Sequence, residues 1–129
     1  MESLRIEAGK SSPEIDFDAA SGVLRIRGES FPENAAKFYQ PVMDWASRFL
    51  CEASGPKAVL ELAIVYFNSS TSKVLMNLFQ MAEKAAASGR DVSVRWICDA
   101  ENETAIECGE EFKEDLSSLP FRIVVTPGG

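Results

Sequence analysis

The chain has 129 residues, of which 46% are hydrophobic and 26% are charged, and its formal net charge is −7. This size and composition are typical of one globular domain, which we expect to span residues 1–129. The acidic charge argues against nucleic acid and anionic membranes as partners, because both favour a basic surface. No apolar run approaches the roughly 20 residues of a membrane span and no signal peptide is read, so we expect a cytoplasmic protein.

The sequence contains no histidine. Its absence removes Ser-His-Asp and Cys-His catalysis, the usual zinc sites and phosphohistidine relays, and we expect neither a metal nor a cofactor. Three cysteines, Cys51, Cys98 and Cys108, are widely spaced and form no Cys-x-x-Cys pair. We interpret them as reduced thiols. The alternative is that Cys98 and Cys108 form one half of a metal site.

The first predicted elements form a hairpin followed by a long helix. Residues 14–18 alternate apolar and acidic side chains as a half-buried strand does, residues 20–22 make a turn, and residues 23–28 form the second strand. Residues 30–34 introduce a helix that reaches about residue 53. Pro41 is expected to kink this helix or to mark the first turn of its main part. A wide apolar face, suited to packing on a sheet, consists of Phe38, Val42, Trp45 and Phe49, flanked by Tyr39, Met43, Ala46 and Leu50.

The second half of the chain alternates strands with helices. Residues 54–56 break the first helix, and the apolar run 59–67 lacks alternation, which predicts a central strand buried on both faces. A helix follows to about Ser88, with Gly89 as its stop signal. Residues 91–98 form a strand, a third helix follows Asp99 with a capping-box spacing at 104–107, and a last strand spans 121–125 before residues 127–129 fray.

This order of elements predicts the fold class. Strands that alternate with helices require crossover connections, which place the strands parallel in one sheet. The hairpin adds antiparallel pairing. We therefore expect a single α/β domain with a mixed, mostly parallel sheet, an N-terminal β-hairpin and about three helices.

Polar side chains gather where the predicted strand 59–67 meets the following helix. Asn68 is followed by four hydroxyl residues, Ser69, Ser70, Thr71 and Ser72. The free N–H groups and the positive end of the dipole at a helix N-terminus favour an anion, so a hydroxyl here is a candidate phosphoacceptor. The alternative is that Asn68 or one of the hydroxyls merely caps the helix.

A phosphate at this junction would change a surface rather than the fold. It adds about −1.5 to −2 charges, which a helix N-terminus tolerates but a partner docked on neutral hydroxyls does not. Lys73, one turn beyond Ser69, would partly screen it. The chain contains no GxxxxGK[ST] or GxGxxG loop and no kinase catalytic loop. A separate kinase must therefore supply the nucleotide, the metal and the base.

The junction resembles that of STAS domains, the anti-sigma-factor antagonists, in which a strand ends in Asp-Ser-Ser-Gly and the first Ser is phosphorylated. Here Asn replaces Asp, and Thr71-Ser72 replaces Gly and an apolar residue. These departures fit the SiaC family of biofilm-regulating phosphoproteins, whose corresponding segment reads Tyr-x-Asn-[Ser/Thr]-Ser. Other blocks that are similar to this family are residues 12–15, 28–34, 109–115 and Phe38-Tyr39-x-Pro41-Val42 followed by Trp45.

The resemblance implies a STAS-like fold and reversible phosphorylation by a dedicated Ser/Thr kinase and a PP2C-type phosphatase. It also implies that the unphosphorylated form binds and activates an effector such as a diguanylate cyclase. The acceptor carries over to Ser69, with Ser70 as second choice. The expected partner-binding region around it consists of Tyr66, Asn68, Ser70, Thr71 and Lys73.

Two other functions remain open at this level. In the first, the chain is a constitutive scaffold or dimerisation domain, and Phe31, Tyr66 and Phe67 form an exposed contact patch. In the second, the chain is an enzyme that uses carboxylates as acid and base, either Glu110 and Glu111 or Asp99 and Glu101. Adjacent helical residues point apart, so Glu110 and Glu111 are more readily interpreted as part of a solvated acidic face.

Overall fold

The computed structural model describes residues 1–52, 55 and 57–127. Six strands and three helices are assigned in this part of the chain: β1 (Leu4–Ile6), β2 (Glu14–Phe17), β3 (Val23–Ser30), α1 (Ala35–Cys51), β4 (Ala58–Phe67), α2 (Ser69–Ala87), β5 (Val92–Asp99), α3 (Glu103–Glu114) and β6 (Phe121–Thr126). The strands form one sheet in the order β1-β2-β3-β4-β5-β6. The expected α/β fold, mixed sheet, N-terminal hairpin and three helices are confirmed.

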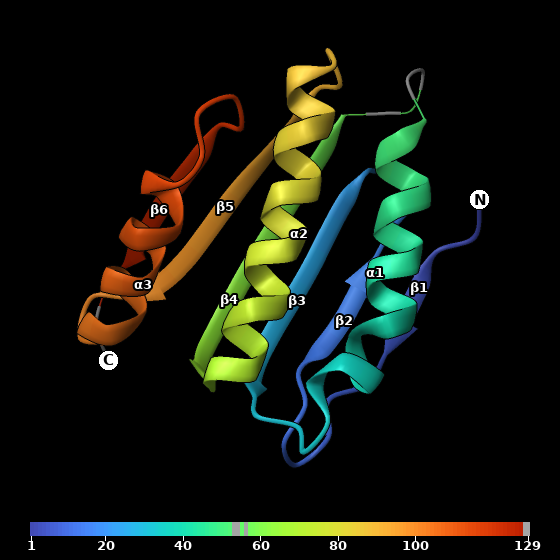
Figure 1. Ribbon diagram of the computed structural model, residues 1–129. Helices are drawn as coiled ribbons and strands as arrows, with labels where there is room; N and C mark the ends of the chain where they lie inside the picture. The colour runs from blue at the N-terminus through green and yellow to red at the C-terminus, as the bar shows by residue number, and fades with distance from the viewer. Residues whose placement is uncertain (53–54, 56, 128–129) are drawn as a thin grey trace.

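The sheet order explains why all three helices lie on the same face. β1, β2 and β3 pair antiparallel, whereas β3, β4, β5 and β6 pair parallel. Each parallel step moves one strand further in the same direction, and right-handed crossovers then place every connecting helix on one side. In Figure 1 the helices α1, α2 and α3 accordingly stand in front of the sheet.

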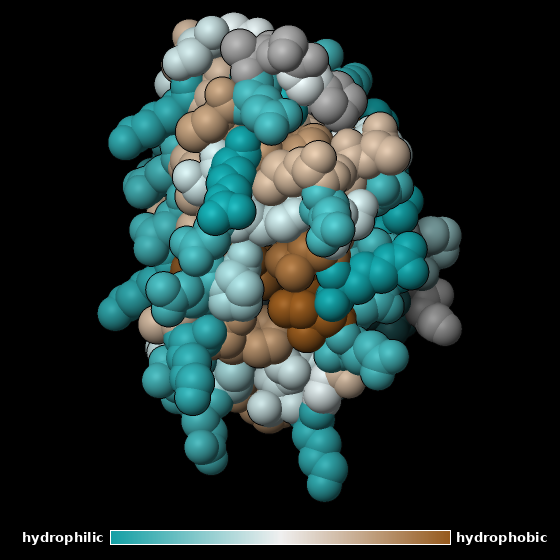
Figure 2. All heavy atoms as spheres, turned by 90° about the vertical axis from the view of Figure 1, so that its right-hand side faces the viewer, coloured by the Kyte–Doolittle hydropathy of each residue, from teal (hydrophilic) through white to brown (hydrophobic). Residues whose placement is uncertain are grey.

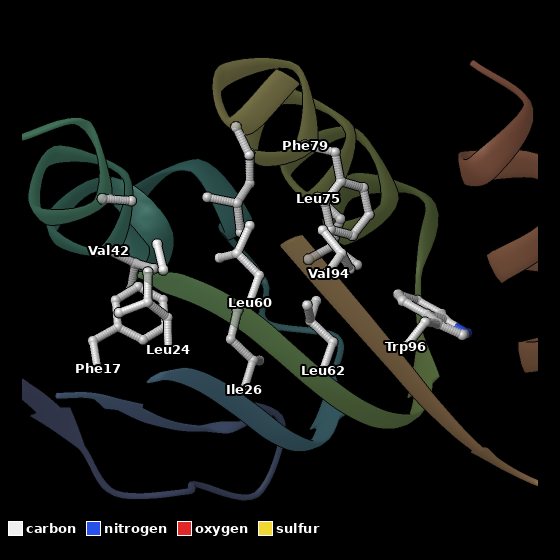
Figure 3. Packing of buried hydrophobic residues seen from close by; sticks show 14 of the residues in the cluster. Phe17, Leu24, Ile26, Val42, Leu60, Leu62, Leu75, Phe79, Val94 and Trp96 are labelled. Carbon is white, nitrogen blue, oxygen red and sulfur yellow. The ribbon is translucent and has the colours of Figure 1, made fainter. Parts of the chain in front are cut away.

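The core lies between this helical layer and the sheet. Figure 3 shows Val42 of α1, together with Leu75 and Phe79 of α2, directed at side chains of the strands. The largest fully buried side chains include Phe17, Leu24, Leu60, Leu62 and Trp96. The apolar face predicted for α1 is mostly buried, although Phe38 is only half-buried. Viewed from the side of α1 and β1, hydrophilic residues surround a small hydrophobic area (Figure 2).

The prediction that the fourth strand is buried on both faces is wrong. Along β4, Leu60, Leu62 and Ile64 are buried, whereas the alternate residues are half-buried or exposed. Among the residues that the structure describes, the helices cover one face of the sheet and none covers the other (Figure 1). Glu61 lies on this open face, where it accepts hydrogen bonds from Arg25 at 2.6 Å and Arg95 at 2.8 Å.

Several element boundaries also differ from the sequence prediction. The sequence does not predict strand β1, because three residues are too short for a clear alternation. This strand is defined by its pairing with β2, in which Leu4 lies opposite Phe17. Pro41 lies inside α1, which continues through it rather than starting there. The helix α3 is capped by Asn102, whose side chain accepts the N–H of Ala105, so the capping box predicted at 104–107 is wrong.

Other boundaries follow the prediction or cannot be compared. The helix α2 ends at Ala87, and Gly89 follows with a φ of 98°, in agreement with its expected role as a stop. The helix α1 ends at Cys51, two residues before its expected end at residue 53, which lies outside the described residues. Most of the breaker at 54–56 and of the frayed end at 127–129 also lies outside them.

Candidate phosphoacceptor site at the start of helix α2

Asn68 lies between β4 and α2 and forms hydrogen bonds with α2 and with the end of β3. Its side-chain oxygen accepts the N–H of Thr71 at 3.0 Å, and its carbonyl accepts the N–H of Ser72 at 3.0 Å. Its own N–H donates to the carbonyl of Ser30 at the end of β3, at 3.1 Å. Asn68 is therefore the N-cap of α2, and the start of this helix is tied to the neighbouring strand.

Ser69 and Ser70 are the first two residues of α2, and both are exposed. Within the described part of the chain, neither their hydroxyls nor their N–H groups form a hydrogen bond. Because Asn68 does the capping, the alternative in which these hydroxyls serve as caps does not apply to them. Two free hydroxyls and two free N–H groups thus meet solvent at the positive end of a 19-residue helix.

The remaining residues of the cluster differ in their surroundings. Thr71 is completely buried, and Ser72 is half-buried. Thr71, which the sequence places in the partner-binding region, therefore has no surface with which to contact a partner directly. Lys73 is exposed on the first turns of α2, where its charge is available to an anion at Ser69.

Sequence reasoning does not find two buried neighbours of Thr71, which are Ser30 and Tyr39. The Ser30 hydroxyl lies 2.7 Å from the Tyr39 hydroxyl and 2.9 Å from that of Thr71, and all three side chains are buried. These residues come from β3, α1 and α2, and only the fold brings them together. In the sequence Ser30 lies between the predicted strand 23–28 and the predicted helix, and a single serine there is too weak a signal.

An exposed aromatic pair lies near the C-terminal ends of β3 and β4, close in sequence to the start of α2. The rings of Phe31 and Tyr66 are 5.7 Å apart in an edge-on arrangement. The register of β3 and β4 shifts between Gly28 and Glu29, so that Val65 is the extra residue of a β-bulge. As a result Val65 and Tyr66 are both exposed, by 65% and 53%. We call Phe31 and Tyr66 the aromatic pair.

The third member of the expected contact patch, Phe67, is half-buried and packs against the core. Its ring packs edge-on against Trp96 at 5.9 Å and stacks near Phe112 at 6.4 Å. The prediction that Phe67 contributes to an exposed patch is wrong. After the bulge, Phe67 pairs with Ser30, and its side chain points to the helical side of the sheet.

The carboxylates considered for catalysis do not form a site. Glu110 and Glu111 are exposed on α3, as expected for a solvated acidic face. Asp99 accepts the N–H of Glu101 at 2.8 Å, which makes it part of the turn between β5 and α3. Their positions give no reason to assign either pair the roles of acid and base.

The cysteines are separate thiols. Cys51 is exposed, Cys98 is buried, and Cys108 is half-buried. Burial raises the pKa of the Cys98 thiol, with a further contribution from Asp99, and burial likewise raises the pKa of Cys108. In the described ranges, no group of three or more cysteine, aspartate or glutamate residues is placed to hold a metal ion. In those ranges, too, no helix has the length and apolar character that crossing a membrane requires.

The capping role of Asn68 gives a first prediction. We expect Asn68→Ala to lower the free energy of unfolding by about 1 kcal/mol, because the Thr71 N–H loses its acceptor. Asn68→Ser should recover most of this loss, since a serine oxygen also accepts at an N-cap. Urea unfolding followed by circular dichroism measures both variants. Equal stability of Asn68→Ala and the wild type would contradict the assigned cap.

Comparisons with known proteins agree over nearly the whole chain. The family model described as SiaC family regulatory phosphoprotein matches residues 6–126. An uncharacterised protein of Pseudomonas aeruginosa strain UCBPP-PA14 is 40% identical over 123 residues, which are 95% of this chain and 96% of that protein.

Two solved structures from Pseudomonas aeruginosa are similar to this fold. The crystal structure of apo-SiaC has a TM-score of 0.86 at 35% sequence identity, and the match covers 96% of this chain and 99% of that one. The crystal structure of the diguanylate cyclase SiaD in complex with its activator SiaC matches with a TM-score of 0.90 at 38% identity. That match covers 95% of this chain and 99% of the other.

Proposed function

The chain belongs to the SiaC family of regulatory phosphoproteins, and from this membership we propose that it is a protein switch controlled by phosphorylation of Ser69. A Ser/Thr kinase adds the phosphate, and a PP2C-type phosphatase removes it. The unphosphorylated form binds and activates an effector. The protein acts through this binding and not through catalysis of its own.

The observation that carries the proposal is the exposed, unbonded Ser69 hydroxyl at a helix start that Asn68 already caps. A kinase can reach this hydroxyl without unfolding the helix. The free N–H groups of Ser69 and Ser70 and the helix dipole then stabilise the phosphate. Lys73 adds a nearby positive charge. Ser70 is also exposed and is the second choice of acceptor.

The same geometry supports a phosphate at Ser69 as the proposed switch. The charge added at the positive end of α2 leaves the domain folded. A partner that covers Ser69 without a phosphate would have to desolvate a dianion for which it has no counter-charge. The aromatic pair at the same edge of the sheet supplies the apolar area that such a partner buries. Binding is therefore lost while the fold is kept.

We propose a diguanylate cyclase as the effector. The support is the solved complex in which the SiaC of Pseudomonas aeruginosa is the activator of the diguanylate cyclase SiaD, together with 38% identity over 95% of this chain. The kinase, the phosphatase and a role in biofilm regulation follow from the family resemblance. Neighbouring genes that encode a Ser/Thr kinase, a PP2C phosphatase and a cyclase would support this set of partners.

Phosphosite mapping tests the proposal. We expect coexpression with the kinase to raise the intact mass by one phosphate, about 80 Da, and fragment spectra to locate it on Ser69. Ser69→Ala should abolish the mass shift, while Ser88→Ala, at the other end of α2, should leave it unchanged. A phosphate found only outside Ser69 and Ser70 would overturn the proposal.

A constitutive scaffold is the second candidate, favoured by the exposure of the aromatic pair without reference to phosphate. In that function the partner binds the pair, and the state of Ser69 is irrelevant. The two functions are separated by comparing the partner affinities of wild type, Ser69→Ala and Ser69→Asp. Equal affinities favour the scaffold.

A further inference from the structure

We propose that Ser30, Tyr39 and Thr71 are positioning residues for the phosphoacceptor, because their buried hydroxyl chain holds the first turn of α2 on the end of β3. The role of Ser69 in this inference rests on the proposed function. The three residues touch neither phosphate nor partner. They act by keeping Ser69 and the aromatic pair in one fixed arrangement.

The direction of the hydroxyl chain follows from counting hydrogens. The Thr71 hydroxyl donates to the carbonyl of Ser30 at 3.1 Å, so its single hydrogen is used there. The Ser30 hydroxyl, 2.9 Å away, must therefore donate to Thr71. The Tyr39 hydroxyl, 2.7 Å from that of Ser30, must then donate to Ser30. Each hydroxyl hydrogen has one acceptor, and the hydrogen bonds are donated in one direction, from Tyr39 of α1 to Ser30 of β3 and from Ser30 to Thr71 of α2.

Burial makes these hydrogen bonds costly to break. Ser30 and Thr71 have no exposed surface, and Tyr39 is only 1% exposed. Water cannot replace a lost partner at such positions, so each broken bond leaves a buried polar group unsatisfied. Burial also raises the pKa of Tyr39 to about 12, against a smaller opposing effect of its bond to Ser30. Tyr39 therefore remains a protonated donor throughout the physiological pH range.

The three linked hydroxyls anchor both parts of the proposed binding surface, the start of α2 and the aromatic pair. The Ser30 carbonyl accepts two donors from the start of α2, the Thr71 hydroxyl and the Asn68 N–H, each at 3.1 Å. Phe31, the next residue after Ser30, belongs to the aromatic pair. A threonine in a helix often donates to a carbonyl of its own helix; here it donates to a neighbouring strand and fixes the helix to it. Ser69 is thus two residues from the bonded Thr71, and Phe31 directly follows the bonded Ser30.

Thr71→Val tests the inference, because valine keeps the shape of threonine and lacks the hydroxyl. We expect faster hydrogen exchange at the N–H groups of Asn68, Thr71 and Ser72, which are the groups bonded at this junction. We also expect kcat/KM for phosphorylation of Ser69 to fall about tenfold, since reactive groups lose rate steeply when misplaced. Thr71→Ser, which keeps the hydroxyl, should restore both properties.

A matched control separates positioning from general loss of stability. Thr126→Val removes another side-chain hydroxyl, which donates to the Cys98 carbonyl at 3.3 Å on the neighbouring strand. It should leave exchange at 68–72 and phosphorylation close to the wild type. If Thr71→Val does not fold, Ser30→Ala interrupts the same chain and replaces it in both assays.

Each outcome decides the inference. Unchanged exchange at 68–72 in Thr71→Val overturns it, and so does faster exchange with unchanged phosphorylation. Failure of the serine variant to restore the wild-type values overturns it as well. If the wild type is phosphorylated on neither Ser69 nor Ser70, the proposed function fails, and the exchange measurements alone still decide whether the three hydroxyls hold the first turn of α2.

Discussion

Ser69→Asp is expected to weaken effector binding by about 2 kcal/mol or more, roughly 30-fold in Kd, while the protein stays folded. The carboxylate places an unpaired charge in the surface that the effector must desolvate. The same charge lies beside the free N–H groups at the N-terminus of α2 and should raise the free energy of unfolding by about 0.3–1 kcal/mol. Calorimetric titration with the effector and urea unfolding measure the two effects.

Ser88→Asp is the matched control for this variant. Ser88 is exposed at the C-terminal end of the same helix, so the substitution adds the same charge to the same element. There the charge opposes the helix dipole, and the free energy of unfolding should fall by about 0.3–1 kcal/mol. Effector binding should not change. If both aspartate variants weaken binding equally, net charge rather than the position of Ser69 is responsible.

Gly109→Ala is expected to destabilise the fold by about 1–2 kcal/mol, although alanine is normally the better helix former. Gly109 lies in α3 against the buried ring of Trp96. A Cβ at this position would meet Trp96 Cδ1 at 2.5 Å and Nε1 at 2.7 Å. The gain of about 1 kcal/mol from helix propensity is therefore outweighed by overpacking.

The Trp96 ring has little room to move away from a Cβ at position 109. Trp96 Nε1 donates to the carbonyl of Ala105 at 2.9 Å. Aromatic side chains surround the ring with centroid distances of 5.4 to 6.4 Å, namely Phe67, Phe79, Phe112 and Phe121. In a Trp96→Leu background the same Gly109→Ala change should cost less, and urea unfolding of the four proteins measures this coupling. A stabilising Gly109→Ala in the wild-type background would contradict the contact.

Local patterns were sufficient for most of the fold. The hairpin of β2 and β3, the helices and the alternation with strands all follow from period, turn residues and stop signals such as Gly89. Burial was harder to predict. The apolar run in β4 suggested two covered faces, but Glu61 in its middle belongs to an open face and binds Arg25 and Arg95 there. The side on which the helices pack depends on strand order, which no local pattern contains.

The candidate site shows the same division. The sequence predicts Ser69 and Ser70 at a helix start because the apolar run ends at Phe67, and the structure leaves both exposed. Thr71, which looks the same in sequence, is buried. Phe67 was expected in an exposed patch, yet one extra residue in β4 turns it inward and Tyr66 outward. A bulge of one residue reverses the side to which every later side chain points.

The amino-acid sequence by itself determined the order of elements, the family resemblance and the hydroxyl-rich start of α2, because each depends on residues close together in the chain. Only the tertiary structure decided which hydroxyls are free. Thr71 is buried because Ser30, 41 positions earlier, lies beside it and links it to Tyr39. Ser69 and Ser70 remain exposed because Asn68 completes the cap and no other element of the described residues packs over them.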